Sequence, residues 1–297
     1  MLEKMTLKDK LIVITGCGYK PAEHIFTDIV TGKPSHDAIY VDETEMKLNV
    51  GAGIAKVLAQ NNASVLVVSK TESKLKNLQQ KLIEQTKNKN INYAALDLLN
   101  QKQVNDFVKK LPKDKTIYWV QSVGLGAGSY KVKDGNPYLK PEDISLELMQ
   151  KESEIVLGTT HIMFNALYPI LKKQKESRIV VITSMSAIRG YSLGCTHCAA
   201  KGAIDRYTNS LMLAKYKENI FVTAVRPGGV DTGMYDNEVV QDAVNTISDE
   251  YNAQYRKHQT YMAPTVVGEV ISTIFTIDAH IPSVNIVAKG QWPNEGS

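Results

Sequence analysis

The chain has 297 residues, of which 43% are hydrophobic and 22% are charged, and this composition excludes an intrinsically disordered protein. Its formal net charge of +4 comes from 35 basic and 31 acidic residues spread along the sequence, which predicts no nucleic-acid partner and only a mild preference for anionic ligands. Three cysteines are too few for a disulfide scaffold, and the amino-terminal segment is too charged for a signal peptide. No run reaches the ~18 apolar residues that a membrane span requires. These features favour a cytoplasmic protein.

Short apolar, β-branched runs alternate along the chain with segments in which apolar residues recur at helical spacing. The predicted strands are 11–15, 65–68, 91–96, 116–120, 178–183, 221–225 and 284–287, and the predicted helices are 54–60, 73–85, 103–110, 146–171, 199–216 and 266–275. This alternation predicts a parallel sheet with helices on both faces, whose continuously apolar strands are buried on both sides. We therefore expect an α/β fold in which 1–297 form a single domain, a doubly wound parallel sheet of about seven strands in three α/β/α layers.

Two connections are longer than this plan requires. Residues 20–48 separate the first strand from its helix, where about two to six residues normally suffice. We interpret 20–48 as an insertion, in which the alternating pattern of 38–48 predicts a hairpin. The second connection, 124–143, is rich in glycine and proline and predicts a loop over the carboxyl edge of the sheet.

Glycines lie at the turn from the first strand to its helix. Thr15, Gly16 and Gly18 end the strand, and Gly51 follows the insertion at the start of the helix. Such glycines let the backbone approach a pyrophosphate, whose charge is met by free N–H groups and by the helix dipole. The pattern indicates a dinucleotide site, although glycine turns are common and do not establish one alone.

Further motifs, in their order and spacing, resemble the short-chain dehydrogenase/reductase family from about residue 8 to 290. They are Thr15-Gly16, Asp97-Leu98, Ser184, Lys201 within Ala199-Ala200-Lys201-Gly202-Ala203, and Arg226-Pro227-Gly228-Gly229-Val230-Asp231-Thr232. The resemblance implies a Rossmann-like fold, a nicotinamide dinucleotide cofactor and a small-molecule carbonyl or alcohol substrate. It also implies a homodimer or homotetramer formed through helices 146–171 and 199–216.

The resemblance implies a role for each cofactor-binding residue. Asp97 would face the adenine amine, Val230 and Thr232 would meet the nicotinamide carboxamide, and Lys201 would bind the ribose hydroxyls. The full set of expected cofactor-binding residues is Thr15, Gly16, Gly18, Asn49, Gly51, Ser69, Lys70, Asp97, Leu98, Gly124, Lys201, Pro227, Gly228, Val230 and Thr232.

The glycine motif departs from the family pattern because of the insertion. In the register that we prefer, Asn49 takes the place of the second glycine and Gly51 that of the third, which turns Ile54 and the following apolar residues toward the sheet. The alternative register uses Gly51 and Gly53 for these two positions. In both registers the inserted segment lies beside the diphosphate.

The end of the second predicted strand indicates which cofactor binds. An NAD site generally places a carboxylate there to accept hydrogen bonds from the ribose, and this carboxylate would repel a 2′-phosphate. This chain has Ser69-Lys70 instead, a hydroxyl and an ammonium group that suit a phosphate. NADP(H) is therefore favoured over NAD(H), the alternative being that Lys70 is an ordinary solvated lysine.

The catalytic residues implied by the resemblance are only partly present. In the family, a Ser holds the substrate carbonyl, a Tyr exchanges the proton, a Lys lowers the Tyr pKa and an Asn anchors a water relay. Here Ser184 and Lys201 stand at the expected separation, but His197 occupies the Tyr position and Val156 the Asn position.

Three hypotheses follow from this departure. First, His197 could replace the phenol of the Tyr, because an ordinary imidazole pKa of about 6.5 suits acid–base catalysis. This requires that its shorter side chain reaches the carbonyl oxygen. Tyr191 is a second candidate proton donor. Alternatively, the chain is a catalytically silent NADP(H)-binding sensor or scaffold. Thirdly, Cys195 and Cys198, at the start of a predicted helix, could form a redox pair; no metal site is predicted, since zinc would need four ligands.

The segment 233–262 corresponds to the family's substrate lid. It contains four tyrosines with three basic residues among them, which suit a medium-sized polar or ring-shaped carbonyl compound or simply face solvent. These residues are Tyr235, Tyr251, Tyr255, Tyr261, Arg256, Lys257 and His258. No particular substrate follows from them.

Overall fold

The computed structural model describes residues 6–28, 31–124, 139–236, 238–251 and 261–289. Seven strands form one sheet in the order β10-β9-β8-β7-β1-β5-β6, and every neighbouring pair is parallel. The strands are β1 (Lys10–Thr15), β5 (Ser64–Ser69), β6 (Ile91–Ala95), β7 (Thr116–Gln121), β8 (Ser177–Ile182), β9 (Ile220–Pro227) and β10 (Ser283–Ile286). The predicted seven-stranded parallel sheet is confirmed.

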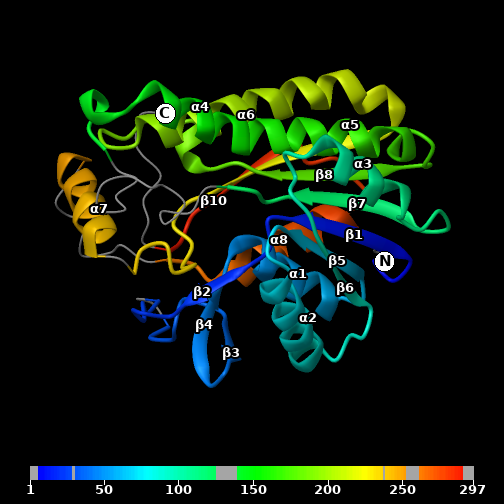
Figure 1. Ribbon diagram of the computed structural model, residues 1–297, viewed down its shortest axis with the longest axis horizontal. Helices are drawn as coiled ribbons and strands as arrows, with labels where there is room; N and C mark the ends of the chain where they lie inside the picture. The colour runs from blue at the N-terminus through cyan, green and yellow to red at the C-terminus, as the bar shows by residue number, and fades with distance from the viewer. Residues whose placement is uncertain (1–5, 29–30, 125–138, 237, 252–260, 290–297) are drawn as a thin grey trace.

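Helices cover both faces of the sheet, as Figure 1 shows. On one face lie α1 (Val50–Gln60), α2 (Glu72–Thr86) and α8 (Pro264–Thr276), and on the other α3 (Gln101–Lys109), α5 (Thr159–Leu171) and α6 (Cys195–Lys215). Successive side chains of β1 divide between the two cores: Ile12 and Ile14 pack with the first group of helices, and Leu11 and Val13 with the second. This explains why the strand is apolar at every position from Leu11 to Ile14, and the three-layer Rossmann-like arrangement is confirmed.

The predicted helix 146–171 is continuous but not uniform. It comprises α4 (Leu146–Ser153), a π-helical turn (Glu154–Gly158) and α5. The wide turn includes Val156, and it changes the direction in which α4 presents its side chains relative to those of α5. Short 3-10 turns occur at Pro141–Asp143, Met185–Ala187 and Tyr216–Glu218.

The insertion forms a small antiparallel sheet of its own, in the order β2-β4-β3. Its strands are β2 (Tyr19–Pro21), β3 (Ala38–Val41) and β4 (Thr44–Leu48). The hairpin predicted in 38–48 is confirmed, with a two-residue turn in which Asp42 and Glu43 both have positive φ, as a type I′ turn requires. The third strand, β2, was not predicted, because three residues carry no measurable periodicity.

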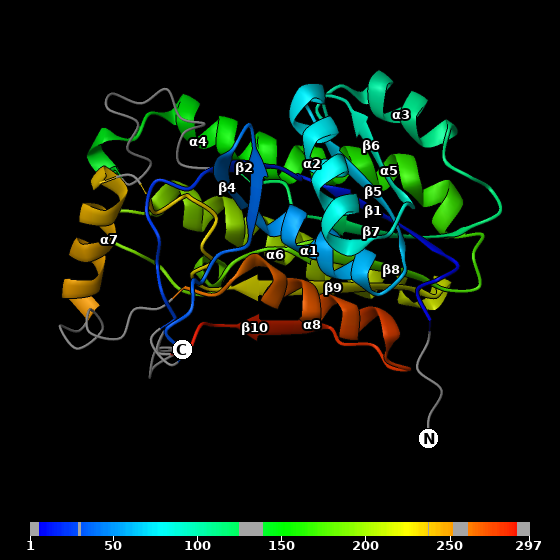
Figure 2. The ribbon, with the colours of Figure 1, turned by 90° about the horizontal axis from the view of Figure 1, so that it is seen from below.

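The order of the strands creates a switch point between β1 and β7. The chain runs from β1 outward through β5 and β6 on one side, and through β7, β8, β9 and β10 on the other. Ligands of doubly wound sheets bind outside the carboxyl ends of the strands at such a point. The insertion and α7 (Glu238–Tyr251) lie near this end of the molecule (Figure 2).

Within the described ranges, no helix combines the length and the apolar character needed to cross a bilayer.

Candidate active site

The turn after β1 is built from glycines that cannot be replaced. Gly16 has a φ of 88°, and a Cβ at this position would lie 2.5 Å from the carbonyl oxygen of Ser122, which follows β7. A Cβ at Gly51 would lie 2.9 Å from the carbonyl oxygen of Gly16, whereas one at Gly53 would meet Pro264 of α8. Gly51 therefore packs the start of α1 against the turn, and Gly53 packs α1 against α8.

Asn49 caps α1 and braces the turn. Its Oδ1 accepts from the N–H groups of Ala52 (2.9 Å) and Gly18 (3.0 Å), and its Nδ2 donates to the carbonyl oxygen of Gly16 (2.8 Å). The first N–H groups of a helix have no intrahelical acceptor. Among the described residues those of Val50 and Gly51 have no acceptor at all, so this helix end can receive an anion.

The residues predicted for the adenosine end contact each other. Ser69 ends β5, and Nζ of the following Lys70 lies 2.8 Å from Oδ2 of Asp97. The Lys70 hydrogen bond, helped by the N–H of Leu99, holds the pKa of Asp97 below its ordinary value. Because the Lys70 side chain is 78% exposed, the pair contributes little to stability and can open without a large cost. Leu98, beside it, is buried.

A pocket of about 330 Å³ opens at the carboxyl edge of the sheet and brings together most of the predicted site. The residues predicted from the sequence that line it are Asn49, Gly124, Ser184, His197, Lys201, Pro227, Gly228, Val230 and Thr232. Thr15, Gly16, Gly18, Gly51, Ser69, Lys70, Asp97 and Leu98 do not line it. The lining residues that were not predicted to bind include Lys20, of the insertion.

Ser184 and Lys201 lie at the floor of this pocket. Ser184 follows β8, and its Oγ accepts from the N–H of Ser186 at 3.1 Å. Lys201, on α6, is only 8% exposed, and its Nζ donates to the carbonyl oxygen of Ile182 at 3.4 Å. Burial lowers the pKa of Lys201 to about 8, against the opposing influence of the charge of Glu152.

Glu152 is a site residue that the sequence did not reveal. It lies on α4, is 1% exposed, and places Oε1 3.3 Å from Nδ1 of His197. Its Oε2 has no hydrogen-bond partner among the described residues. A buried carboxylate with one free oxygen is costly unless it serves a function. The available signal was its position one helical turn before Val156, where a polar catalytic residue was expected.

Val156, at the position of the family's Asn, and Gln121, at the end of β7, both have structural roles. Val156 is 2% exposed in the apolar core, so it presents no polar group to the pocket. Gln121 is also buried: its Oε1 accepts from Oγ1 of Thr15 (2.6 Å), and its Nε2 donates to Oγ1 of Thr160 (2.6 Å). It therefore ties β1 and β7 to α5, and Thr15 is a bracing residue of this network.

The cysteines do not have the environment expected of a redox pair. The predicted helix does begin at Cys195, which is exposed, but Cys198 is half-buried and burial raises the pKa of its thiol. Desolvation of the thiolate thus outweighs the helix terminus, contrary to the sequence-based hypothesis. Burial also raises the pKa of Cys17 to about 12. Among the described residues, no group of three or more His, Cys, Asp or Glu side chains could hold a metal ion.

The lid segment is described only in part. Tyr235 lines the pocket and stacks on Tyr261, with ring centroids 4.4 Å apart. The backbone of 229–231 pairs with Met262, which joins the end of the lid to the motif after β9. The side chain of Tyr251 and the residues Tyr255, Arg256, Lys257 and His258 lie outside the described part of the chain, as does most of the loop 124–143.

Comparison with protein families and curated proteins gives a consistent result. A model of the short chain dehydrogenases matches residues 48–243. An uncharacterized oxidoreductase of Staphylococcus epidermidis is 28% identical over 187 residues, which cover 62% of this chain and 75% of that protein. A 3-oxoacyl-[acyl-carrier-protein] reductase of Rickettsia felis is 25% identical over 197 residues, covering 66% of this chain and 75% of that protein.

Solved structures share the fold over almost the whole chain. An NADPH-bound short-chain oxidoreductase of Pseudomonas aeruginosa PAO1, described as containing an atypical catalytic center, has a TM-score of 0.70 at 14% identity, covering 98% of this chain and 99% of that chain. L-Sorbose reductase of Gluconobacter frateurii, complexed with NADPH and L-sorbose, has a TM-score of 0.69 at 16% identity, covering 96% and 97%. At these identities the comparison establishes a common fold.

Proposed function

The chain belongs to the short-chain dehydrogenase family, and from this premise we propose that it is an NADP(H)-dependent oxidoreductase that reduces a carbonyl, or oxidises an alcohol, on a small molecule. The observation that carries the proposal is the buried Glu152 carboxylate against Nδ1 of His197, in the same pocket as Ser184 and Lys201. A chain that had lost its chemistry would have no reason to keep a costly buried charge behind the residue at the proton-donor position.

The described residues fit the cofactor. The N–H groups of Val50 and Gly51 suit the diphosphate, and Lys201 suits the ribose hydroxyls. Lys70 and Ser69 suit a 2′-phosphate, because the exposed Lys70 ammonium can turn from Asp97 to a doubly charged group at little cost. The NADPH-bound neighbours from Pseudomonas aeruginosa and Gluconobacter frateurii support this choice, and Pro227, Gly228, Val230 and Thr232 would hold the nicotinamide end.

The mechanism assigns one task each to Ser184, His197 and Glu152. Bound NADPH would supply the hydride that the carbonyl carbon receives. The hydroxyl of Ser184 donates to the carbonyl oxygen, and Nε2 of His197 delivers the proton that turns this oxygen into an alcohol. Glu152 accepts the Nδ1–H and compensates the positive charge of the doubly protonated ring. In the direction of oxidation, the neutral ring accepts the proton from the alcohol.

The exposure of His197 explains how the site can work without the family's Asn. The ring that has given up a proton must recover it from solvent. Since the His197 side chain is 35% exposed, water reaches it directly and no relay through the position of Val156 is needed.

NADPH oxidation over a panel of aldehydes, ketones and ketoses tests the proposal. We expect turnover by the wild-type protein, a loss of about 10²- to 10⁴-fold in His197→Gln, and near-normal rates in Tyr191→Phe, which removes the other candidate donor. Calorimetric titration should show tighter binding of NADPH than of NADH. Binding of NADPH with background rates on every carbonyl compound would instead establish the silent binder.

Oligomerisation can be tested in the same preparations. We propose a homodimer or homotetramer that pairs through the face of α4, α5 and α6, because Leu146 (70% exposed) and Leu213 (72% exposed) present apolar side chains there. Light scattering coupled to gel filtration should give a mass of two or four chains, and Leu213→Glu should reduce it to one.

A further inference from the structure

The insertion brings a lysine into the pocket. Lys20 lies on β2, two residues after Gly18, and lines the same pocket as Asn49 and Val50 of the α1 terminus. Neighbouring residues of a strand point to opposite faces. Accordingly Tyr19 points to α2, where Nδ2 of Asn77 lies 3.5 Å from its hydroxyl, while Lys20 points to the pocket.

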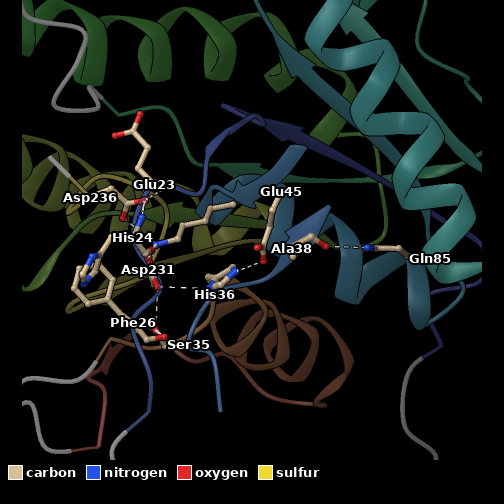
Figure 3. Close-up of polar contacts among 11 residues, drawn as sticks. Glu23, His24, Phe26, Ser35, His36, Ala38, Glu45, Gln85, Asp231 and Asp236 are labelled. Carbon is tan, nitrogen blue, oxygen red and sulfur yellow. Dashed lines mark hydrogen bonds and ion pairs between the residues drawn. The ribbon is translucent and has the colours of Figure 1, made fainter. Parts of the chain in front are cut away.

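A buried network holds β2 and β4 against the segment after β9. Lys47, the cross-strand partner of Lys20, is fully buried, with Nζ 2.7 Å from Oδ1 of Asp231 and 2.9 Å from Oδ1 of Asp236. The same two carboxylates accept from Oγ of Ser35 (3.0 Å) and from the N–H groups of Glu23 (2.9 Å) and His24 (3.1 Å), as Figure 3 shows.

The opposite edge strand of the small sheet, β3, is fixed as well. Nε2 of Gln85, on α2, donates to the carbonyl oxygen of Ala38 at 2.9 Å, and Nε2 of His36, just before β3, lies 2.8 Å from Oε1 of Glu45 on β4 (Figure 3). The small sheet is therefore held at β4 and at β3, and Lys20 occupies a defined place beside the pocket.

The ammonium group of Lys20 has no fixed anionic partner. It makes no hydrogen bond or ion pair with any residue in the described part of the chain. Burial lowers its pKa and the charge of Lys74 adds to this, whereas the charges of Asp236 and Glu23, neither of them in contact with the ammonium group, act in the opposite direction. The nearby Asp236 is already engaged by Lys47 and by two backbone N–H groups. A half-buried ammonium group that faces a pocket without a counter-ion is a site for an anion.

The glycine turn shows which anion this is. The N–H of Gly18, in the glycine turn after β1, donates to Asn49 and is therefore not available to a phosphate. The free donors that remain next to Lys20 are the N–H groups of Val50 and Gly51. We propose that Lys20 binds the diphosphate of the dinucleotide and replaces the donor that Asn49 has taken, so that the insertion is part of the cofactor site. This inference rests on the proposed function, since it requires that a dinucleotide binds.

Calorimetric titration of three ligands separates the diphosphate from the other anions. NADPH carries a diphosphate and a 2′-phosphate, ADP-ribose carries only the diphosphate, and adenosine 2′-monophosphate carries only the 2′-phosphate. In Lys20→Gln we expect Kd to rise about 10- to 100-fold for NADPH and for ADP-ribose, and to stay within twofold for adenosine 2′-monophosphate. Lys20→Arg, which keeps the charge, should retain most of the affinity.

Controls distinguish the possible failures. Lys102→Gln removes an exposed lysine of α3 and should leave all three affinities unchanged, and thermal melts should show that Lys20→Gln is folded. Unchanged NADPH affinity in Lys20→Gln, including the case in which only the KM of an acidic substrate rises, would overturn the inference. A loss confined to the ligands with a 2′-phosphate would also overturn it. If the wild-type protein bound neither NADPH nor NADH, the proposed function itself would fail.

Discussion

Replacement of Lys47 by methionine should destabilise the protein strongly, because it removes the lysine that lies between two buried carboxylates in the described network. The side chains of Asp231 and Asp236 are 0% and 2% exposed. Asp236 would keep two backbone N–H donors, but Asp231 would keep Oγ of Ser35 and the more distant Nδ1 of His36, 3.9 Å away. Breaking a buried pair in this way costs about 3–5 kcal/mol. At about 2–3 °C per kcal/mol for a domain of this size, Tm should fall by roughly 6–15 °C.

Thermal melts of matched variants test whether charge is the cause. Lys102→Met breaks an exposed i,i+4 pair with Asp106 and should change the free energy of unfolding by at most about 0.5 kcal/mol. The double variant Lys47→Met/Asp231→Asn should recover part of the loss, because it removes the charge left without a partner. A Tm of Lys47→Met within 2 °C of wild type, or a further decrease in the double variant, would refute the reasoning.

Three further outcomes follow from the site. Glu152→Gln keeps the shape of the side chain but removes the charge behind His197, so kcat should fall about 10- to 100-fold while the Kd of NADPH stays within twofold. Burial lowers the pKa of Lys201 to about 8, so its positively charged form is lost as the pH rises through 8. The Kd of the anionic NADPH should therefore rise over this range in titrations from pH 7 to 9. Lys201→Met should abolish this pH dependence. Iodoacetamide should modify the exposed Cys195 in the native protein and spare Cys17, because Cys17 is 3% exposed and burial raises its pKa to about 12. Mass spectrometry of the peptides would show which cysteine is modified.

The elements predicted from the sequence are those whose evidence is local. The centre of β1, from Leu11 to Ile14, is continuously apolar because both of its faces are buried, and Asp42 and Glu43 interrupt a clear alternation, so strand and hairpin were both predictable. The motif residues also follow strand ends, and most of them meet in one pocket. Glu152 and Lys20 were not predictable as site residues, because a Glu on a polar helix and a Lys on a three-residue strand resemble ordinary surface residues.

Tertiary contacts alone determine the roles of Glu152 and Lys20. Glu152 is buried only because the π-helical turn and α6 bring it to His197, and Lys20 faces the pocket only because Lys47 fixes the neighbouring strand. The environment of Cys198 has the same origin: its place near a helix start was predictable, but the long-range contacts that half-bury it were not. Sequence patterns report the periodicity of burial, whereas long-range pairing decides which polar residue faces a pocket.

The two departures from the family pattern meet at the same pocket. We propose that His197, backed by Glu152, acts there as the proton donor, and that Lys20 and the α1 terminus hold the diphosphate. Lys47 pairs with both Asp231 and Asp236 but carries one positive charge against two negative ones. We propose that the cofactor is attracted locally, by Lys20, Lys201 and the α1 terminus, and not by the small net charge of the chain, which is spread along the sequence. Raising the salt concentration should therefore weaken NADPH binding less than it weakens a purely surface-bound nucleotide, because partly buried charges are screened less.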